Sequence, residues 1–225
     1  MAKRTQTTAA LRTPLNRERV LQAALALADE GGLEALSMRK LAQELGVEAM
    51  SLYNHVENKD DIVDGILDLV ASEIELPPEG ADWKTAIRLK AVSRFAAYRR
   101  HPWAAKSWMS SRKVSPERFR HPEAVLRSLR EAGFSKDVIY HAYHTLDAYV
   151  LGFSLQEANF PYEAKELKAM ASKFLREFPV DEYPDLTEHI KHHMDPPHDD
   201  AGAFELGLDL ILDGLERLRE TAPGD

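Results

Sequence analysis

Side chains able to contact a nucleic-acid duplex are gathered in one short stretch of this sequence. Tyr53, His55 and Lys59 carry a hydroxyl, an imidazole and an ammonium, which can all donate hydrogen bonds to phosphate oxygens. Ser51 and Asn54 can hydrogen-bond the edge of a base. Phosphate contacts hold a protein in register and base contacts give sequence preference, so these residue types could supply both.

Two short helices are predicted to position these side chains. Ser37 is suited to cap a helix whose apolar residues recur at i, i+1 and i+4, and Gly46 can end that helix in a left-handed conformation. After three residues a second helix begins at Met50 or Ser51, with Leu52 facing inward. Such a pair with a Gly-containing turn forms a helix-turn-helix, whose second helix lies in the DNA major groove.

The same segment resembles the TetR family of bacterial transcriptional repressors. The resemblance is carried by the runs 38–47 and 51–59, in which a Leu-Tyr-x-His-Val-x-x-Lys cluster follows Gly46 at the family's spacing. It continues over residues 16–32 and 59–67, so it covers roughly a quarter of the chain. A bare helix-turn-helix pattern has little specificity, whereas this cluster between matching helices is specific.

The resemblance implies a role for each DNA-contacting residue. Positions that grip the phosphate backbone match Ser37, Met38, Arg39, Tyr53, His55 and Lys59. Base reading falls to Arg39, Ala49, Met50, Ser51 and Asn54. At the last four of these positions the chain departs from the tetracycline-repressor type of the family, so the resemblance implies no operator sequence. The structural alternative for Tyr53 and His55 is a pair of half-buried rings that pack the small domain.

Charge is divided unevenly along the chain. The net charge is −8, yet residues 1–60 hold eight Lys/Arg and eight Asp/Glu, so the excess acid belongs to residues 61–225. Residues 1–17 contain four basic residues and no acidic one. This pattern fits a nucleic-acid-binding end on an acidic body, although the same asymmetry can arise by chance.

The remaining composition restricts the class of protein. The 225 residues suffice for one large or two modest domains, and no run of 18 apolar residues predicts a membrane span. No secretory signal is visible, and the absence of cysteine is compatible with a reducing compartment. We therefore expect a cytoplasmic protein with no membrane partner.

Helical periodicity and helix-breaking residues predict an all-α chain in three parts. We expect a flexible basic arm over 1–14, a helix-turn-helix DNA-binding domain over 15–76 and, by the resemblance, a larger helical effector-binding and dimerisation domain over 77–225. Besides the two short helices, the predicted helices cover residues 17–30, 58–74, 82–100, 102–109, 117–132, 136–159, 163–178 and 203–220. Residues 179–202 are expected to be mainly loop.

Two of these helices are apolar on more than one side. The second faces comprise Ala142, Thr145, Tyr149 and Gly152 in one helix and Leu206, Gly207, Leu210 and Gly214 in the other. A helix that is apolar on two sides is covered twice, either inside one large core or by a partner chain. Residues 204–216 also resemble the tetracycline-repressor type of C-terminal domain, which favours a homodimer formed through a four-helix bundle.

The resemblance also implies a small-molecule effector held within the helical C-terminal domain. Candidate lining residues are Phe95, Tyr98, Trp103, Trp108, Met109, Tyr140, His144 and Phe174. Aromatic residues at helical spacing are also typical of a core. We expect an apolar or aromatic effector in a cavity of at least about 300 Å³. The His and Glu that hold a magnesium chelate in the tetracycline-repressor type are absent near residues 106–109 and at Gln156, so the resemblance does not extend to tetracycline sensing. No cofactor is expected.

Nine histidines raise the question of a metal centre. A catalytic zinc site needs three convergent ligands, and no His-Glu-x-x-His pattern is present. Two histidines share a helix face and four more cluster in an acidic segment: His141, His144, His189, His192, His193 and His198. We predict no metal site and no catalytic residue, and we interpret the cluster as a solvated loop.

These observations predict a ligand-responsive transcriptional regulator, preferably a repressor. It would bind a palindromic operator as a homodimer and be released by a small-molecule effector. The alternative is a helical protein of the same fold with binding or enzymatic activity and no regulatory role. Specific retention of a palindromic duplex distinguishes the two.

Overall fold

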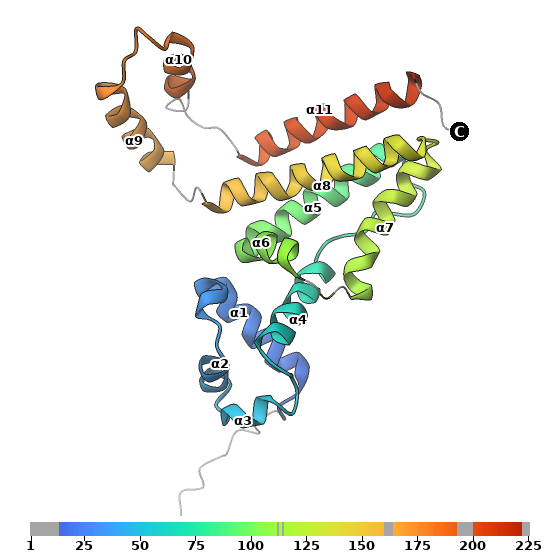
Figure 1. The fold of residues 1–225 in the computed structure, drawn as a ribbon, viewed down its shortest axis with the longest axis vertical. Helices are drawn as coiled ribbons and strands as arrows, with labels where there is room; N and C mark the ends of the chain where they lie inside the picture. Colours follow the sequence, from blue (N-terminus) through green and yellow to red (C-terminus); the bar gives the residue numbers. More distant parts are fainter. Residues whose placement is uncertain (1–13, 112, 114, 160–163, 193–199, 222–225) are drawn as a thin grey trace, which may run out of the picture. The chain divides into compact units, whose positions relative to one another are not determined.

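The protein is all-α in the part of the chain that its computed structural model describes, as the sequence predicts (Figure 1). The described residues are 14–111, 113, 115–159, 164–192 and 200–221, so the predicted arm lies outside them except for Pro14. They form two compact units that divide between Leu69 and Val70. None of the described helices is both long and apolar enough to cross a membrane.

The first unit contains the predicted helix-turn-helix. Its helices are α1 (Arg17–Ala35), α2 (Met38–Leu45), α3 (Ala49–Leu52) and the first part of α4 (Lys59–Ser72). The backbone of α1 leaves helical geometry at Gly31 and Gly32, next to its predicted end, and one further turn then runs to Ala35. That extra turn was not predicted, because a glycine pair usually ends a helix.

Local capping residues set the boundaries of α2 and α4 as predicted. The Ser37 hydroxyl accepts a hydrogen bond from the Lys40 amide at 3.2 Å. Gly46 ends α2 with φ 64° and ψ 38°, a left-handed conformation that favours glycine, while Val47 N donates to Ala42 O at 3.0 Å. Asn58 Oδ1 accepts from the Asp61 amide at 2.9 Å and caps α4.

The second unit continues from the end of α4 through seven further helices. These are α5 (Trp83–Arg100), α6 (Pro102–Ser110), α7 (Pro116–Glu131), α8 (Lys136–Asn159), α9 (Ala164–Glu177), α10 (Pro184–His192) and α11 (Asp200–Thr221). Helix α8 packs against α5, α6, α7 and α11 (Figure 1). At the centre of this packing, Phe204 stacks on Phe95 at 4.1 Å between ring centroids, and Phe153 meets Phe95 edge-on at 5.5 Å.

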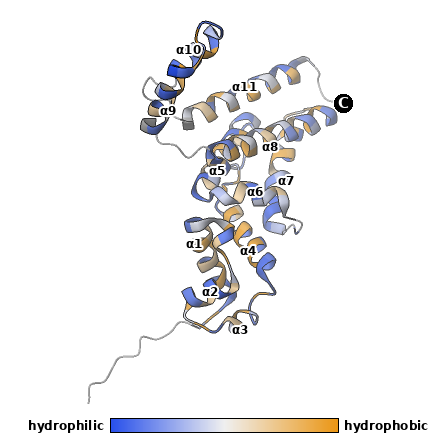
Figure 2. Cartoon of the chain, turned by 60° about the vertical axis from the view of Figure 1, so that its left-hand side comes forward, coloured by the Kyte–Doolittle hydropathy of each residue, from blue (hydrophilic) through white to orange (hydrophobic). Residues whose placement is uncertain are grey.

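Helix α10 corrects the prediction that residues 179–202 are mainly loop. Pro184 occupies the first helical position, where the missing amide hydrogen is no loss, so this proline begins a helix rather than breaking one. The Thr187 hydroxyl is buried and donates to Tyr183 O at 2.8 Å. Figure 2 shows α10 as largely hydrophilic, with few apolar residues, Leu186 and Ile190. His189 and His192 therefore lie on a helix, while His193 and His198 lie outside the described residues.

The inward face of α11 is apolar. Phe204, Leu208 and Leu212 are fully buried, Leu215 is 6% exposed, and Leu218 is about half exposed. Exposed ion pairs flank this face and join α5 to α11: Lys84 pairs with Asp213, and Arg88 pairs with Glu205 and Asp209. Exposed pairs of this kind add little stability. The apolar face therefore contributes most to holding α11.

Close packing of α4 on α1 yields a stability prediction. A Cβ atom at residue 65 would lie 2.6 Å from Cδ2 of Leu21, so Gly65→Ala should destabilise the protein by about 1–3 kcal/mol in denaturant unfolding. Leu21→Ala removes the atoms that clash. The double variant Leu21→Ala/Gly65→Ala should therefore lose less stability than the sum of the two single losses. Strictly additive losses would contradict this packing.

Candidate functional site

The short helix α3 exposes large side chains on one face while the other is buried. Met50 is 75% exposed and Tyr53 48% exposed, whereas Leu52 and Val56 are almost fully buried. A four-residue helix gains little from its own hydrogen bonds, so the buried pair must hold it in place. Exposure of large apolar groups at such a site is typical of a binding surface.

The other predicted DNA-contacting residues lie in the same unit, at the start of α2 and around α3. Ser37, Arg39, Asn54 and Lys59 are exposed, and half-buried positions are held by Met38, Ala49, Ser51 and His55. Tyr53 is 48% exposed, so this residue has the partial burial of the packing alternative and still presents part of its surface to solvent. His55 is half-buried, and its backbone carbonyl accepts a hydrogen bond from Arg17 Nη1 at 3.1 Å.

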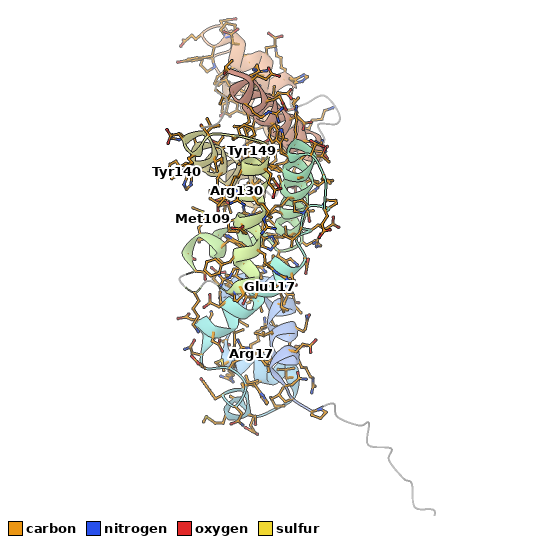
Figure 3. The ribbon with its side chains drawn as sticks, turned by 90° about the vertical axis from the view of Figure 1, so that its right-hand side faces the viewer. Arg17, Met109, Glu117, Arg130, Tyr140 and Tyr149 are labelled. Carbon is orange, nitrogen blue, oxygen red and sulfur yellow. The ribbon has the colours of Figure 1, made fainter. Side chains whose placement is uncertain are left out.

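An ion pair that was not predicted fixes the turn between α3 and α4. Arg17 Nη1 and Nη2 donate to the two carboxylate oxygens of Asp61 at 2.8 and 2.9 Å, and the Glu57 amide donates to the same carboxylate at 3.0 Å. The hydrogen bond to Asp61 raises the pKa of Arg17. Arg17, labelled in Figure 3, thus joins the start of α1 to the start of α4. In the sequence it had indicated only a basic N-terminal segment.

Lys59 has a structural contact besides its predicted role. Its ammonium donates a hydrogen bond to Leu33 O, near the end of α1, at 2.9 Å. An ammonium has three donors, so a phosphate contact stays available. Lys59→Ala would consequently remove a fold contact together with any phosphate contact.

A cavity of about 220 Å³ lies in the second unit. Residues of four helices line it: Ile87, Lys90, Ala91 and Arg94 of α5; Trp108 of α6 with Ser111 just after it; Arg118, Phe119, His121, Pro122 and Val125 of α7; and Tyr143, Leu146, Asp147 and Val150 of α8. Its volume is below the predicted minimum of about 300 Å³.

The cavity wall contains charged and polar groups that are buried. Lys90, Arg94 and His121 are 6%, 7% and 5% exposed. Arg94 Nη1 donates to Asp147 Oδ1 at 2.5 Å and its Nε donates to Tyr98 Oη at 2.9 Å. Arg94 Nη2 and His121 Nδ1 have no hydrogen-bond partner in the described part of the chain. Buried polar groups without partners are rare in folded proteins and need an explanation.

Burial changes the protonation of two of these groups. Burial, with the nearby charge of Arg94, lowers the pKa of Lys90 to about 7, and Asp147 offsets this only in part. Burial and the charge of Lys90 lower the pKa of His121 to about 4, against a hydrogen bond to the backbone of Ala71. His121 is therefore neutral near pH 7, while the ammonium form of Lys90 is disfavoured relative to a lysine in water.

The structure does not bring the eight predicted effector residues together. Trp108 lines the cavity and Tyr98 bonds to Arg94 beside it. Phe95 belongs to the core, and Trp103 is half-buried. Exposed positions outside the cavity lining are held by Met109, Tyr140, His144 and Phe174. Figure 3 labels Met109 and Tyr140. Aromatic spacing thus missed Lys90, Arg94 and His121. The signal for Arg94 was its place on the inward face of α5, in register with Ile87 and Tyr98.

A groove of about 360 Å³ separates parts of α8 and α11. It is lined by four members of the predicted second faces, Ala142, Thr145, Leu210 and Gly214, and by Val138, His141, Ile211, Leu215 and Leu218. Tyr149 and Gly207 pack against each other instead, and the Tyr149 hydroxyl donates to Phe204 O at 2.8 Å. Three leucines of α11, Leu206, Leu210 and Leu218, stay exposed.

Among the described residues, no three His, Cys, Asp or Glu side chains are placed to hold a metal ion. His141 and His144 of α8 each lie beside the ring of Tyr140, with centroids 5.3 and 4.6 Å away. Half of the predicted histidine cluster, His193 and His198, lies outside the described residues.

Family models match nearly the whole length of the chain. The model of bacterial regulatory proteins of the tetR family matches residues 20–66, and the model of the tetracyclin repressor-like C-terminal domain matches residues 76–219. The chain is 34% identical to the HTH-type transcriptional repressor DrrR1 of Streptomyces coeruleorubidus, over 93% of this chain and 82% of that protein. It is 32% identical to the tetracycline repressor protein class D of Escherichia coli, over 90% and 89%.

Solved structures agree with these matches. ActR of Streptomyces coelicolor, solved in complex with actinorhodin, has a TM-score of 0.75 and 29% identity, covering 91% of this chain and 98% of that one. TetR of Acinetobacter baumannii AYE has a TM-score of 0.70 and 27% identity, covering 94% and 100%.

The buried lysine yields a pH prediction. The folded protein releases the Lys90 proton around pH 7, while the unfolded chain keeps it until about 10.5, so the contribution of Lys90 to the free energy of unfolding should rise with pH between these values. Lys90→Met should be more stable than wild type at pH 7, and this advantage should shrink by pH 9.5. Urea unfolding at several pH values measures the difference.

The exposed Lys106 of α6 supplies the matched control for that experiment. Lys106→Met should track the wild type at every pH, because a solvated ammonium loses little free energy on folding. A Lys90→Met curve parallel to the wild-type curve would show that Lys90 is not buried in its charged form.

Proposed function

This chain belongs to the tetR family of bacterial regulatory proteins, and we propose that it is a transcriptional repressor that binds a palindromic operator as a homodimer and is released by a small-molecule effector. The observation that carries the proposal is the recognition helix α3, which exposes Met50 and Tyr53 from a rigidly anchored turn. The proposal includes no enzymatic step. The alternative of a non-regulatory protein of the same fold has no such observation in its favour.

In this proposal the predicted residues contact DNA in two ways. Ser37, Tyr53, His55 and Lys59 bind phosphates, while Met50 and Ser51 meet base edges with help from Arg39, Ala49 and Asn54. Exposure of the Met50 side chain supports contact with a thymine methyl group. The predicted division into a DNA-binding domain over 15–76 and an effector-binding domain over 77–225 is part of the proposal.

Dimerisation through α8 and α11 is supported by the exposed apolar side chains of α11. The exposed Leu206, Leu210 and Leu218 lie on α11, and two of them border the groove against α8. Exposed leucines in this density mark an interaction surface. A second copy of the chain would cover them, as in the predicted four-helix bundle.

The cavity of the second unit is the proposed effector site, in place of the predicted aromatic set. Its buried groups without partners and its enclosure by four helices support this choice. ActR has been solved in complex with small molecules, actinorhodin and (S)-DNPA, which supports ligand binding by a relative of this fold. Effector binding that changes operator affinity by about 1–3 kcal/mol would suffice for a switch.

Tyr53→Phe and Met50→Ala should change DNA binding in two different ways. Tyr53→Phe should weaken binding to cognate and scrambled duplexes by similar factors, because it removes a phosphate contact. Met50→Ala should instead change which bases are preferred, at a cost of about 1–3 kcal/mol for a lost base contact. Electrophoretic mobility shifts with an inverted-repeat duplex and with single-base variants of it measure both effects.

The wild type itself provides the stricter test of the regulator assignment. It should retain a duplex with two inverted half-sites more strongly than the same duplex with one half-site scrambled. Equal retention of every duplex, or equal effects of Tyr53→Phe and Met50→Ala on cognate and scrambled DNA, would remove the proposed function.

A charge at the α8–α11 groove should separate the subunits. Leu210→Glu would bury an unpaired carboxylate in the proposed interface. The dimer of two 25.4 kDa chains should therefore dissociate into monomers, as measured by light scattering at micromolar concentration. Leu89→Glu, at an exposed leucine of α5 away from the groove, should leave the dimer intact. A wild-type monomer under these conditions would contradict the proposal.

A further inference from the structure

The effector cavity has an excess of buried positive charge. Lys90, Arg94 and Arg118 line it, and Asp147 is the one acid among the described lining residues. Asp147 already accepts a hydrogen bond from Arg94 Nη1. Lys90 is 6% exposed and the charge of Asp147 offsets its burial only in part, while Arg94 Nη2 has no hydrogen-bond partner in the described part of the chain. A buried cation without a partner is costly, so an anion in the cavity would relieve that cost.

A fold-only explanation does not account for Lys90. Methionine or leucine at this position of α5 would fill a similar volume without loss of solvation, and such replacements of buried charges are often stabilising. Arg94 differs, because Asp147 and Tyr98 give it structural partners on α8 and α5. A group that costs stability at one wall of a cavity is typical of a functional site.

The rest of the lining limits the size and shape of the ligand. Trp108, Phe119 and Tyr143 supply aromatic surface, and the exposed ring of Phe119 marks the side that is open to solvent. The volume is about 220 Å³. An apolar cavity of about 150 Å³ can hold benzene, so this one has room for a single substituted ring.

His121 adds a requirement for a donor on the ligand. Its ring is neutral near pH 7 and hydrogen-bonds to the backbone of Ala71, which uses the one N–H that a neutral imidazole has. The other nitrogen, Nδ1, is then an acceptor, and it has no partner among the described residues. A hydroxyl group on the ligand could donate to it.

We propose that the cavity binds a single-ring aromatic carboxylate that carries a hydroxyl group, with the carboxylate held by Lys90 and Arg94 and the hydroxyl donating to His121. This inference rests on the proposed function, because it names the chemical class of the effector. Hydrogen bonds between a carboxylate and charged donors are stronger than those of a neutral amide. The site should therefore select acids over isosteric amides.

Isothermal titration calorimetry of the full-length protein with benzoate, benzamide and the three hydroxybenzoate isomers tests the proposal. Benzoate should bind at least about ten-fold more tightly than benzamide at pH 7. The best hydroxybenzoate isomer should bind more tightly than benzoate. Equal or weaker binding of benzoate relative to benzamide, or no detectable binding of any carboxylate, would overturn the proposal.

A variant assigns the selectivity to the buried ammonium. Lys90→Met should bring the benzoate-to-benzamide affinity ratio close to one, and this variant removes a buried charge, so it should fold. Lys106→Met, which removes an exposed ammonium of α6, should keep the wild-type ratio. An unchanged ratio in Lys90→Met would overturn the role of Lys90, and circular dichroism of both variants verifies folding.

Operator retention on the same wild-type preparation distinguishes two kinds of failure. If the protein retains the inverted-repeat duplex but does not prefer benzoate to benzamide, the effector class is wrong and the repressor function stands. If it prefers no duplex, the proposed function fails whatever the ligand data show.

Discussion

A charged side chain buried in a helical core loses its hydration, and hydrogen bonds or opposite charges in the protein must compensate for that loss. The two units of this regulator differ in how completely they do so. In the first unit, the buried Asp61 accepts hydrogen bonds from Arg17 and from the Glu57 amide. In the second unit, the buried Arg94 keeps Nη2 without a hydrogen-bond partner in the described part of the chain, and the charge of Asp147 offsets the burial of Lys90 only in part. The paired Asp61 holds the turn between α3 and α4 in place. The incompletely paired cations of the cavity leave donors for a bound anion.

The geometry fixed by Asp61 is the one that α3 needs. A helix of four residues cannot form by itself, because nucleation costs more than a single turn returns. Its position depends on Leu52, which is buried beneath it, on Gly46, which turns the chain into it, and on the Arg17–Asp61 pair, which holds the turn after it. Met50 and Tyr53 can then stay in solvent without loss of order, as a surface that reads DNA requires.

Sequence patterns predicted what is decided within a few residues of chain. Ser37, Gly46 and Asn58 act on backbone groups three or four positions away, so the helix-turn-helix and its boundaries were predictable. The Arg17–Asp61 pair joins residues 44 positions apart in the sequence. The cavity is lined by residues of four helices, and no local sequence pattern predicts how these helices pack against one another. Aromatic spacing therefore selected residues that the structure does not gather in one cavity, and it gave no signal for the buried cations of the cavity wall.

The division between the two units falls inside helix α4. The last carbonyls of a helix have no partner within the helix, and the hydrogen bond from His121 reaches the backbone of Ala71 at that end. The first turn of the same helix contains Asp61, the anchor of the turn after α3. A ligand of the proposed class that bonds to His121 Nδ1 would contact a ring that is itself bonded to the end of α4, and one such hydrogen bond contributes about 0.5–1.5 kcal/mol.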